Sequence, residues 1–152
     1  MNIYQASIED LEGISELFNL YRIFYRQPSD LDAAQAFIKE RLINRDSIIF
    51  AAVNDGTYAG FTQLYPTFSS VSMKRDLILN DLYVHEDARK LGAGRLLLDA
   101  AKEYAIKTGA KGLSLQTAHD NYTAQRLYES YGYQQETEFM SYHLSVASVE
   151  QG

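Results

Sequence analysis

The sequence predicts an α+β (mixed α/β) fold, in which helices flank a central, twisted, mostly antiparallel sheet that contains one parallel strand pair. Three observations indicate this class. Two segments near the N-terminus place apolar residues at helical spacing, residues 47–84 alternate with the period of strands, and a strand, a helix and a strand follow over residues 71–117. Because such a crossover makes its two strands parallel, the sheet is expected to be mixed.

The N-terminal part is expected to hold one strand and two helices. Residues 2–6 alternate, and Ser7 then caps a helix whose apolar residues share one face: Ile8, Leu11, Ile14, Leu17, Phe18 and Tyr21. A second helix is expected to begin at Ser29 or Asp30 and to end at Asn44. Residues 21–26, between the two helices, are predicted to form an aromatic and basic connector.

The middle of the chain has the period of strands. Strands are expected over residues 48–53 and 58–65, because Asp55-Gly56 between them is a hairpin signal. Residues 66–70 are predicted to be a polar loop. A long strand is then expected from about residue 71 to residue 84.

The rest of the chain is expected to alternate helices and strands. A helix after Gly92 and Gly94 is predicted to stop at Gly109. A short strand over residues 112–117 and a helix that ends at Gly132 should follow. The predicted cap of that helix is Asp120 or Asn121. A closing hairpin is expected from residues 133–135 and 138–144.

Length and composition indicate one globular domain. The chain has 152 residues, of which 46% are hydrophobic and 22% are charged. We expect a single domain over residues 1–145 and a C-terminal tail over residues 146–152. No apolar run approaches the length of a membrane span, and the N-terminus lacks the pattern of a signal peptide, so a cytoplasmic location without a membrane partner is expected.

Several kinds of chemistry are excluded or disfavoured. The chain has no cysteine, which excludes disulfides, thiolate metal sites and an acyl-cysteine intermediate. Its three histidines are scattered and form no metal-ligand pattern, so no metal is expected. The formal net charge of -6 argues against general nucleic-acid binding, because phosphate contacts need a basic footprint.

The stretch from Leu82 to Arg95 indicates an anion site, because a strand there runs through a glycine turn into a helix whose first amides lack partners. Two common phosphate motifs do not match. A P-loop needs Gly-Lys-Ser/Thr where this chain has Gly94-Arg95-Leu96. A dinucleotide fingerprint needs a third glycine or an alanine where this chain has Leu97.

The spacing Arg89-x-x-Gly92-x-Gly94 resembles the acyl-CoA motif of the GNAT superfamily of N-acetyltransferases. A second motif strengthens the resemblance. Residues 121–133 resemble the Asn-x-x-Ala-x-x-Leu-Tyr-x-x-x-Gly-Phe signature of that superfamily, with Tyr133 in place of phenylalanine. The predicted order of elements also matches, so the resemblance covers nearly the whole chain.

The resemblance implies a GNAT-like acyl-CoA N-acyltransferase fold, in which the parallel strand pair splays and admits pantetheine, with acetyl-CoA as co-substrate. Strand backbone would pair with the pantetheine amides, while helix amides and basic side chains would face the pyrophosphate. A backbone amide near Tyr83 or Val84 would stabilise the oxyanion. The implied cofactor-binding residues are Leu82, Tyr83, Val84, Arg89, Lys90, Leu91, Gly92, Ala93, Gly94, Arg95, Asn121 and Tyr128.

Two residues are the candidate catalytic groups. The resemblance makes Tyr128 the proton donor to the departing thiolate, whereas periodicity alone favours a core residue on an apolar helix stripe. Asp81 lies near the implied acetyl site and is a candidate base, directly or through water, or else a hydrogen-bonding residue of the strand. Relatives that acetylate small amines often have Glu-Asp where this chain has Asn80-Asp81. His119 is a further candidate base.

The resemblance therefore implies direct transfer of acetyl to a primary amine of a small molecule or a peptide, in a ternary complex. Phe24, Tyr25 and Phe68 are candidates for the wall of the acceptor pocket, and Asp30 and Asp32 for attracting a cation. A non-catalytic acyl-CoA sensor is the alternative function. A homodimer is also compatible with the sequence.

Overall fold

The computed structural model describes residues 1–147, and residues 148–152 of the expected tail lie outside the described residues. The chain divides into two compact units, Met1–His119 and Asp120–Gly152. The expectation of one domain over residues 1–145 stays a prediction.

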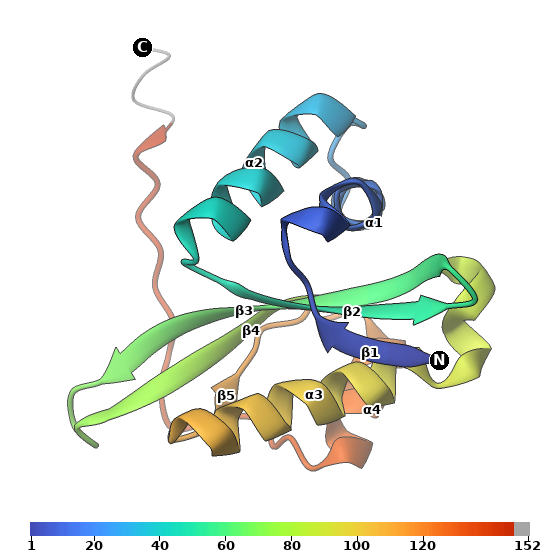
Figure 1. The fold of residues 1–152 in the computed structure, drawn as a ribbon. Coiled ribbons are helices and arrows are strands. Elements are labelled where there is room, and N and C mark those ends of the chain that lie inside the picture. The colour runs from blue at the N-terminus through green and yellow to red at the C-terminus, as the bar shows by residue number, and fades with distance from the viewer. Residues whose placement is uncertain (148–152) are drawn as a thin grey trace. The chain divides into compact units, whose positions relative to one another are not determined.

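The first unit is built on a five-stranded sheet in the order β1-β2-β3-β4-β5 (Figure 1). The first four strands pair antiparallel, and β4 pairs with β5 in parallel. This confirms the predicted mixed sheet. The strands are β1 Asn2–Gln5, β2 Ile48–Asn54, β3 Thr57–Ser69, β4 Lys74–Val84 and β5 Leu113–Ser114.

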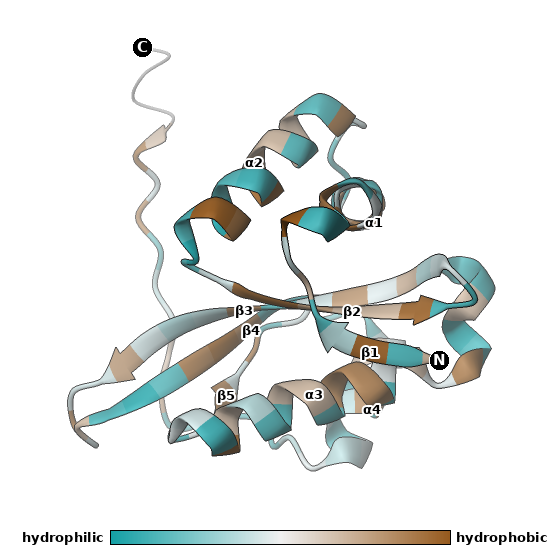
Figure 2. Ribbon diagram, viewed as in Figure 1, coloured by the Kyte–Doolittle hydropathy of each residue, from teal (hydrophilic) through white to brown (hydrophobic). Residues whose placement is uncertain are grey.

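Helices cover both faces of this sheet. Figure 1 shows α1 (Leu11–Phe24) and α2 (Leu31–Asn44) on one face and α3 (Ala93–Thr108) on the other. The Asp30 carboxylate caps α2 by accepting a hydrogen bond from the Ala33 amide (3.1 Å). Figure 2 shows polar and apolar residues alternating along α2 and α3, as expected of helices with one face on a sheet.

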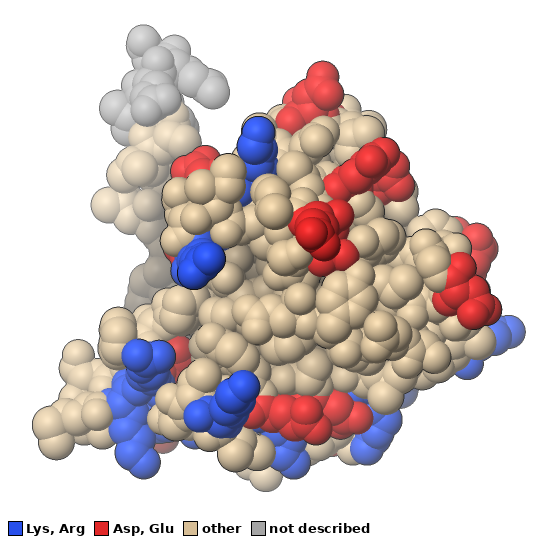
Figure 3. All heavy atoms as spheres, viewed as in Figure 1, with Lys and Arg blue, Asp and Glu red and all other residues tan. Residues whose placement is uncertain are grey.

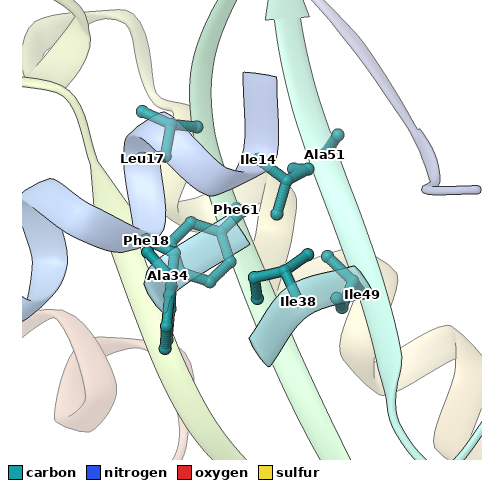
Figure 4. Close-up of a cluster of buried hydrophobic side chains, with 8 residues drawn as sticks. All are labelled: Ile14, Leu17, Phe18, Ala34, Ile38, Ile49, Ala51 and Phe61. Atoms are coloured by element: carbon teal, nitrogen blue, oxygen red, sulfur yellow. The ribbon is translucent and has the colours of Figure 1, made fainter. Parts of the chain in front are cut away.

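Separate groups of buried side chains hold the two helical layers to the sheet. On the side of α1 and α2, a cluster of mostly large apolar side chains packs against the sheet (Figure 4). It consists of Ile14, Leu17, Phe18, Ala34, Ile38, Ile49, Ala51 and Phe61. The cluster on the α3 side consists of four alanines, Ala52, Ala59, Ala88 and Ala93, together with Leu97. Small side chains let the start of α3 lie close to the strands.

Two element boundaries differ from the predictions because of contacts between distant residues. Residues 21–24 belong to α1 and not to a connector, since the Tyr21 ring packs edge-on against Phe61 and Tyr83. Residues 66–69 continue β3 and do not form a loop. Pro66 is tolerated there because β2 stops pairing at Leu64, so the missing N–H of Pro66 faces an edge that no strand of residues 1–147 pairs with.

The second unit contains α4 (Tyr122–Tyr131), which begins after the predicted cap Asn121 and ends at Gly132 in a left-handed conformation (φ 117°). The predicted closing hairpin is wrong, because no strand occurs over the described residues 133–147. Phe139, Tyr142 and Leu144 are exposed there by 78%, 88% and 85%. A segment with alternating apolar residues forms a strand only if a neighbouring strand pairs with its backbone. Within residues 1–147, no strand pairs with residues 133–147.

Candidate active site

The edge of β4 that faces β5 is open over most of its length. The two strands pair only at Leu77 with Leu113 and at Ile78 with Ser114. From Leu79 to Val84, β4 continues without a strand partner on that edge among the described residues. The backbone polar groups that point to that edge are therefore available to an extended ligand that adds itself like a strand, apart from the Val84 carbonyl, which accepts a hydrogen bond from Arg89.

The passage from β4 to α3 differs from the expected direct glycine turn. A 3₁₀ helix, Glu86–Leu91, comes first, and Gly92 then takes a left-handed conformation (φ 78°) before α3 begins at Ala93. The Arg89 Nε donates to the Val84 carbonyl (3.1 Å), and the His85 amide donates to the Ala59 carbonyl (2.7 Å). These bonds hold the end of β4 in place.

The N-terminus of α3 is suited to an anion. Its first turn contains no acidic residue, so no side chain of that turn neutralises the positive end of the helix dipole. Arg89, Lys90 and Arg95 are exposed around it. Gly94 lies within the helix without a positive φ, so backbone conformation does not require glycine at this position, whereas close approach of a ligand would.

The predicted cofactor residues of this segment do not all present side chains to solvent. The Ala93 side chain is fully buried in the cluster under α3, so only the backbone of Ala93 is available to a ligand. Leu91 is 53% exposed, whereas Leu82, Tyr83 and Val84 are half-buried. The predicted contacts of all these residues with acetyl-CoA stay predictions.

A β-bulge in β4 interrupts the register beside Asp81. Leu64 of β3 pairs with Leu79, and Gln63 pairs with Asp81, so Asn80 is the extra residue of β4. Residues Asp81 and Gln63 therefore lie directly opposite each other on neighbouring strands. The bulge falls within the part of β4 that has an open edge.

Asp81 is a buried carboxyl group with hydrogen bonds to both oxygens. Its side chain is 2% exposed. The Gln63 amide nitrogen donates to Oδ2, and the Asn80 amide nitrogen donates to Oδ1 (2.7 Å). Burial raises the pKa of Asp81, while the hydrogen bonds from Asn80, Gln63 and Tyr21 act to lower it. A carboxylate in this environment is a stronger base than one in water.

Two tyrosines from different elements flank this carboxyl group. Tyr21 of α1 is half-buried, and its hydroxyl donates to the Asn80 carbonyl (3.2 Å). Burial, and secondarily the negative charge of Asp81, raise the pKa of Tyr65 on β3 to about 12. Tyr65 also feels the charges of Arg41 and Asp46. Asp81 therefore has hydroxyl groups as neighbours on the α1 and α2 face of the sheet.

The second unit carries the other two predicted site residues. The Asn121 Oδ1 accepts a hydrogen bond from the Ala124 amide (3.3 Å), which is the geometry of a helix cap. Tyr128 is 9% exposed, and its ring lies edge-on to Tyr133 with 5.7 Å between ring centroids. This burial agrees with both hypotheses for Tyr128, a core residue of the helix and a proton donor in catalysis. The roles of Asn121 and Tyr128 stay predictions.

Sequence reasoning missed Gln63, Ser47 and Tyr21 as neighbours of Asp81. A signal was present for Gln63, because it occupies a core-facing position between Phe61 and Tyr65 in an alternating strand, where an apolar residue is the norm. His119, the other candidate base, is exposed. Residues 1–147 contain no group of three acidic or histidine side chains that could hold a metal, and no helix among them is long and apolar enough to cross a membrane.

Comparisons with known proteins identify the family. Residues 12–133 match the model of the acetyltransferase (GNAT) family. The uncharacterised N-acetyltransferase YhfO of Bacillus subtilis is 58% identical over 96% of this chain and 98% of its own length. A crystal structure of a probable acetyltransferase has a TM-score of 0.91 and 41% identity, and the match covers 96% of this chain and 98% of that one.

A more distant relative is named for its substrate. The L-ornithine N5-acetyltransferase NATA1 of Arabidopsis thaliana is 30% identical over 60% of this chain and 40% of its own length. The family match and the similar crystal structure agree with the mixed sheet and its flanking helices. The chain belongs to the GNAT family and is an acetyl-CoA-dependent N-acetyltransferase.

Proposed function

We propose that this enzyme transfers the acetyl group of acetyl-CoA to a primary amine of a small cationic molecule, by direct attack in a ternary complex. The observation that carries the proposal is the continuity of residues 79–95. The open edge of β4 leads within one chain segment to the N-terminus of α3, so one extended ligand can contact both.

The residues of this segment fit acetyl-CoA. The groups of Leu82, Tyr83 and Val84 that point to the open edge of β4, other than the Val84 carbonyl bound by Arg89, suit the amides of pantetheine. The amides at the start of α3 suit the pyrophosphate. Arg89, Lys90 and Arg95 would add positive charge. Acetyl-CoA, when bound, supplies an acetyl thioester. A backbone amide at Tyr83 or Val84 would donate a hydrogen bond to the oxygen that becomes negative during transfer.

Asp81 would serve as the base that removes a proton from the amine. Because the Asp81 side chain is buried and both its oxygens accept hydrogen bonds, the proton would arrive through an intervening group rather than by direct contact. The half-buried Tyr21 hydroxyl, which faces Asp81, or a water molecule would be that group. Tyr128 would protonate the departing thiolate.

Charge and the named relative support a small cationic acceptor. The net charge of the chain is -6, and Figure 3 shows acidic side chains gathered over α1 and the start of α2 on the viewed face. These side chains would raise the local concentration of a cation near the Asp81 face of the sheet. Because NATA1 is named as an enzyme for ornithine, diamino acids and polyamines are the first acceptors to test.

A CoA-release assay with a panel of amines tests the proposal. The panel should contain diamino acids, polyamines, arylalkylamines, aminoglycosides and a peptide with a free N-terminus. We expect release with at least one dibasic small molecule, with lines that intersect in initial-rate plots, as a ternary complex requires. Measured acetyl-CoA binding without release by any acceptor would contradict the proposal and favour a sensor.

A matched pair of variants then tests the base. Asp81→Asn keeps the size of the side chain and removes its basicity, so kcat/KM should fall by about 10²-fold or more. The acidic limb of the kcat/KM profile, which in the wild type should lie above the ordinary aspartate value of about 4, should disappear. Asp76→Asn, on the same strand but away from the bulge, should leave the profile unchanged.

A further inference from the structure

A chain of three polar side chains crosses the sheet from β2 to β4. Ser47, just before β2, donates its hydroxyl to Gln63 Oε1 (2.8 Å), and Gln63 Nε2 donates to Asp81 Oδ2. Gln63 is fully buried on β3 and is the cross-strand neighbour of Asp81. The sequence separations of 16 and 18 residues show that only strand pairing brings these groups together.

The directions of these hydrogen bonds fit an ionised Asp81 carboxylate. An ionised carboxylate has no hydrogen to donate, so the Gln63 amide must present its NH₂ group to Asp81. The Gln63 oxygen then points the other way and meets the Ser47 hydroxyl. By donating to the Gln63 oxygen, the Ser47 hydroxyl helps to keep the Gln63 NH₂ group turned towards Asp81.

We infer that Ser47 and Gln63 are positioning residues that keep the Asp81 carboxylate ionised and in one orientation, ready to accept a proton. The inference rests on the proposed role of Asp81 as base. Burial by itself favours the neutral carboxyl, which cannot act as a base. Hydrogen bonds to charged groups are among the stronger ones in proteins, so the donor from Gln63 opposes this effect of burial.

The other polar groups around Asp81 do not replace the Gln63 donor. The Asn80 amide from the bulge already donates to Oδ1. Tyr21 of α1 faces the carboxyl group. Tyr65 of β3 feels the charge of Asp81 and also those of Arg41 on α2 and of Asp46. Gln63 donates to Oδ2, the carboxyl oxygen that the Asn80 amide does not contact, and the Tyr21 hydroxyl adds a hydrogen bond to the same carboxyl group. Loss of that donor should therefore change the proton affinity of Asp81 directly.

The test measures the titration of the Asp81 carboxyl carbon by NMR in the full chain without ligands. Asp81→Asn assigns the signal. Gln63→Met, which has similar length and no donor, should move the titration midpoint upward by about one to two pH units. Ser47→Ala should also raise the titration midpoint, but by less than Gln63→Met does. In this variant the Gln63 amide loses the hydrogen bond that orients it but keeps the NH₂ group that donates to Asp81.

Thr62→Val is the matched control. Thr62 is also fully buried on β3, but its hydroxyl donates to the Asp81 backbone carbonyl (2.8 Å) and not to the carboxyl group. The carboxyl midpoint should therefore stay within about 0.3 pH units of the wild-type value, although the variant loses a buried hydrogen bond. Midpoints of Gln63→Met and Ser47→Ala that equal the wild-type value would overturn the inference. If Gln63→Met does not fold, Ser47→Ala alone decides.

A second readout separates this inference from the proposed function. With an accepted amine, the acidic limb of kcat/KM should follow the NMR midpoint in each variant. An NMR midpoint that moves while the acidic limb stays in place would uphold the Ser47 and Gln63 chain as the control of Asp81 ionisation, and would remove Asp81 as the base.

Discussion

At the scale of single residues, burial decides which chemistry is open to each polar side chain. Asp81 is buried, accepts hydrogen bonds from neighbouring side chains and has a raised pKa, a combination that is common in catalytic bases. Tyr128 is also buried, and its contact with the Tyr133 ring agrees with a helix core. Burial alone does not distinguish a catalytic tyrosine from a core tyrosine, so the distinction needs a kinetic measurement.

Tyr128→Phe removes only the hydroxyl group. If Tyr128 protonates the thiolate, kcat should fall by about 10²-fold or more, while the Kd of CoA changes by less than about two-fold. Stopped-flow kinetics and calorimetry measure the two effects. Tyr122→Phe, an exposed tyrosine on the same helix, serves as control and should retain wild-type kinetics. Equal kcat values for Tyr128→Phe and the wild type would assign Tyr128 to the core.

At the scale of elements, the start of α3 combines two opposing requirements. An acidic residue in the first turn would stabilise a helix by about 0.3–1 kcal/mol, and α3 has none there. Its basic residue Arg95 is less favourable for the helix but more favourable for a phosphate ligand. The residues of this first turn are therefore better suited to binding an anion than to stabilising the helix, which agrees with the proposed pyrophosphate site.

Charge reversal at Arg95 should separate these effects. Arg95→Glu should weaken acetyl-CoA binding by about tenfold or more, because it places negative charge beside the pyrophosphate. Thermal stability should be retained, since an acid suits this end of the helix. Lys107→Glu makes the same charge change in the exposed last turn of α3 and should leave the Kd of acetyl-CoA within about two-fold. Similar Kd changes in both variants would contradict a local pyrophosphate site.

At the scale of the whole molecule, the first unit is held together by a buried polar network as well as by its apolar clusters. Asp10 accepts hydrogen bonds from the hydroxyls of Tyr4 (2.6 Å) and Tyr58 (2.7 Å) and from the Ser7 amide (2.9 Å). Tyr58 fits here because a Cβ at Gly13 would lie only 2.3 Å from its ring. The network therefore joins β1, β3 and the start of the first helix.

This network predicts how stability changes with pH. Burial raises the pKa of Asp10, but the hydrogen bonds from Tyr4, Ser7 and Tyr58 together lower it further, so the net pKa lies below the ordinary value. A lowered folded-state pKa contributes stability above the unfolded-state value of about 4, and this contribution is lost as pH falls through the folded-state pKa.

Asp10→Asn should therefore lower the free energy of unfolding at pH 7 by about 1–3 kcal/mol. Its free energy of unfolding should also fall less than that of the wild type between pH 5 and pH 2. Urea unfolding at several pH values measures both effects. Parallel pH curves for Asp10→Asn and the wild type would show that the network does not depend on the Asp10 charge.

Local patterns predicted much of the fold and of the cofactor segment. The stop glycines Gly109 and Gly132 end their helices as predicted. Ser7 caps a 3₁₀ turn, Ile8–Asp10, that leads into α1, and Asp30 and Asn121 are each one of the two caps that the sequence allowed. These are signals between residues a few positions apart, so they can be read without knowledge of the fold. The same holds for the glycine turn between β4 and α3, although the intervening 3₁₀ helix was not foreseen.

Boundaries that depend on distant partners were not predictable in this way. The helical state of residues 21–24 follows from the packing of Tyr21 on Phe61 and Tyr83, and the strand state of Pro66 follows from the absence of a β2 partner. For the hairpin expected after Gly132, the sequence pattern predicted strands that the structure does not contain over residues 133–147. A strand-like alternation was present, but no strand among the described residues pairs with it.

The sequence by itself determined the family, the order of elements up to α4 and the segment that would bind acetyl-CoA, because periodicity, caps and glycine spacing are properties of neighbouring residues. Only the tertiary structure decided what surrounds Asp81. Ser47, Gln63 and Asp81 meet because a bulge at Asn80 shifts the pairing of β3 with β4, so that Gln63 lies opposite Asp81 on the same face of the sheet. Such a contact depends on strand register, which no local pattern in this chain specifies.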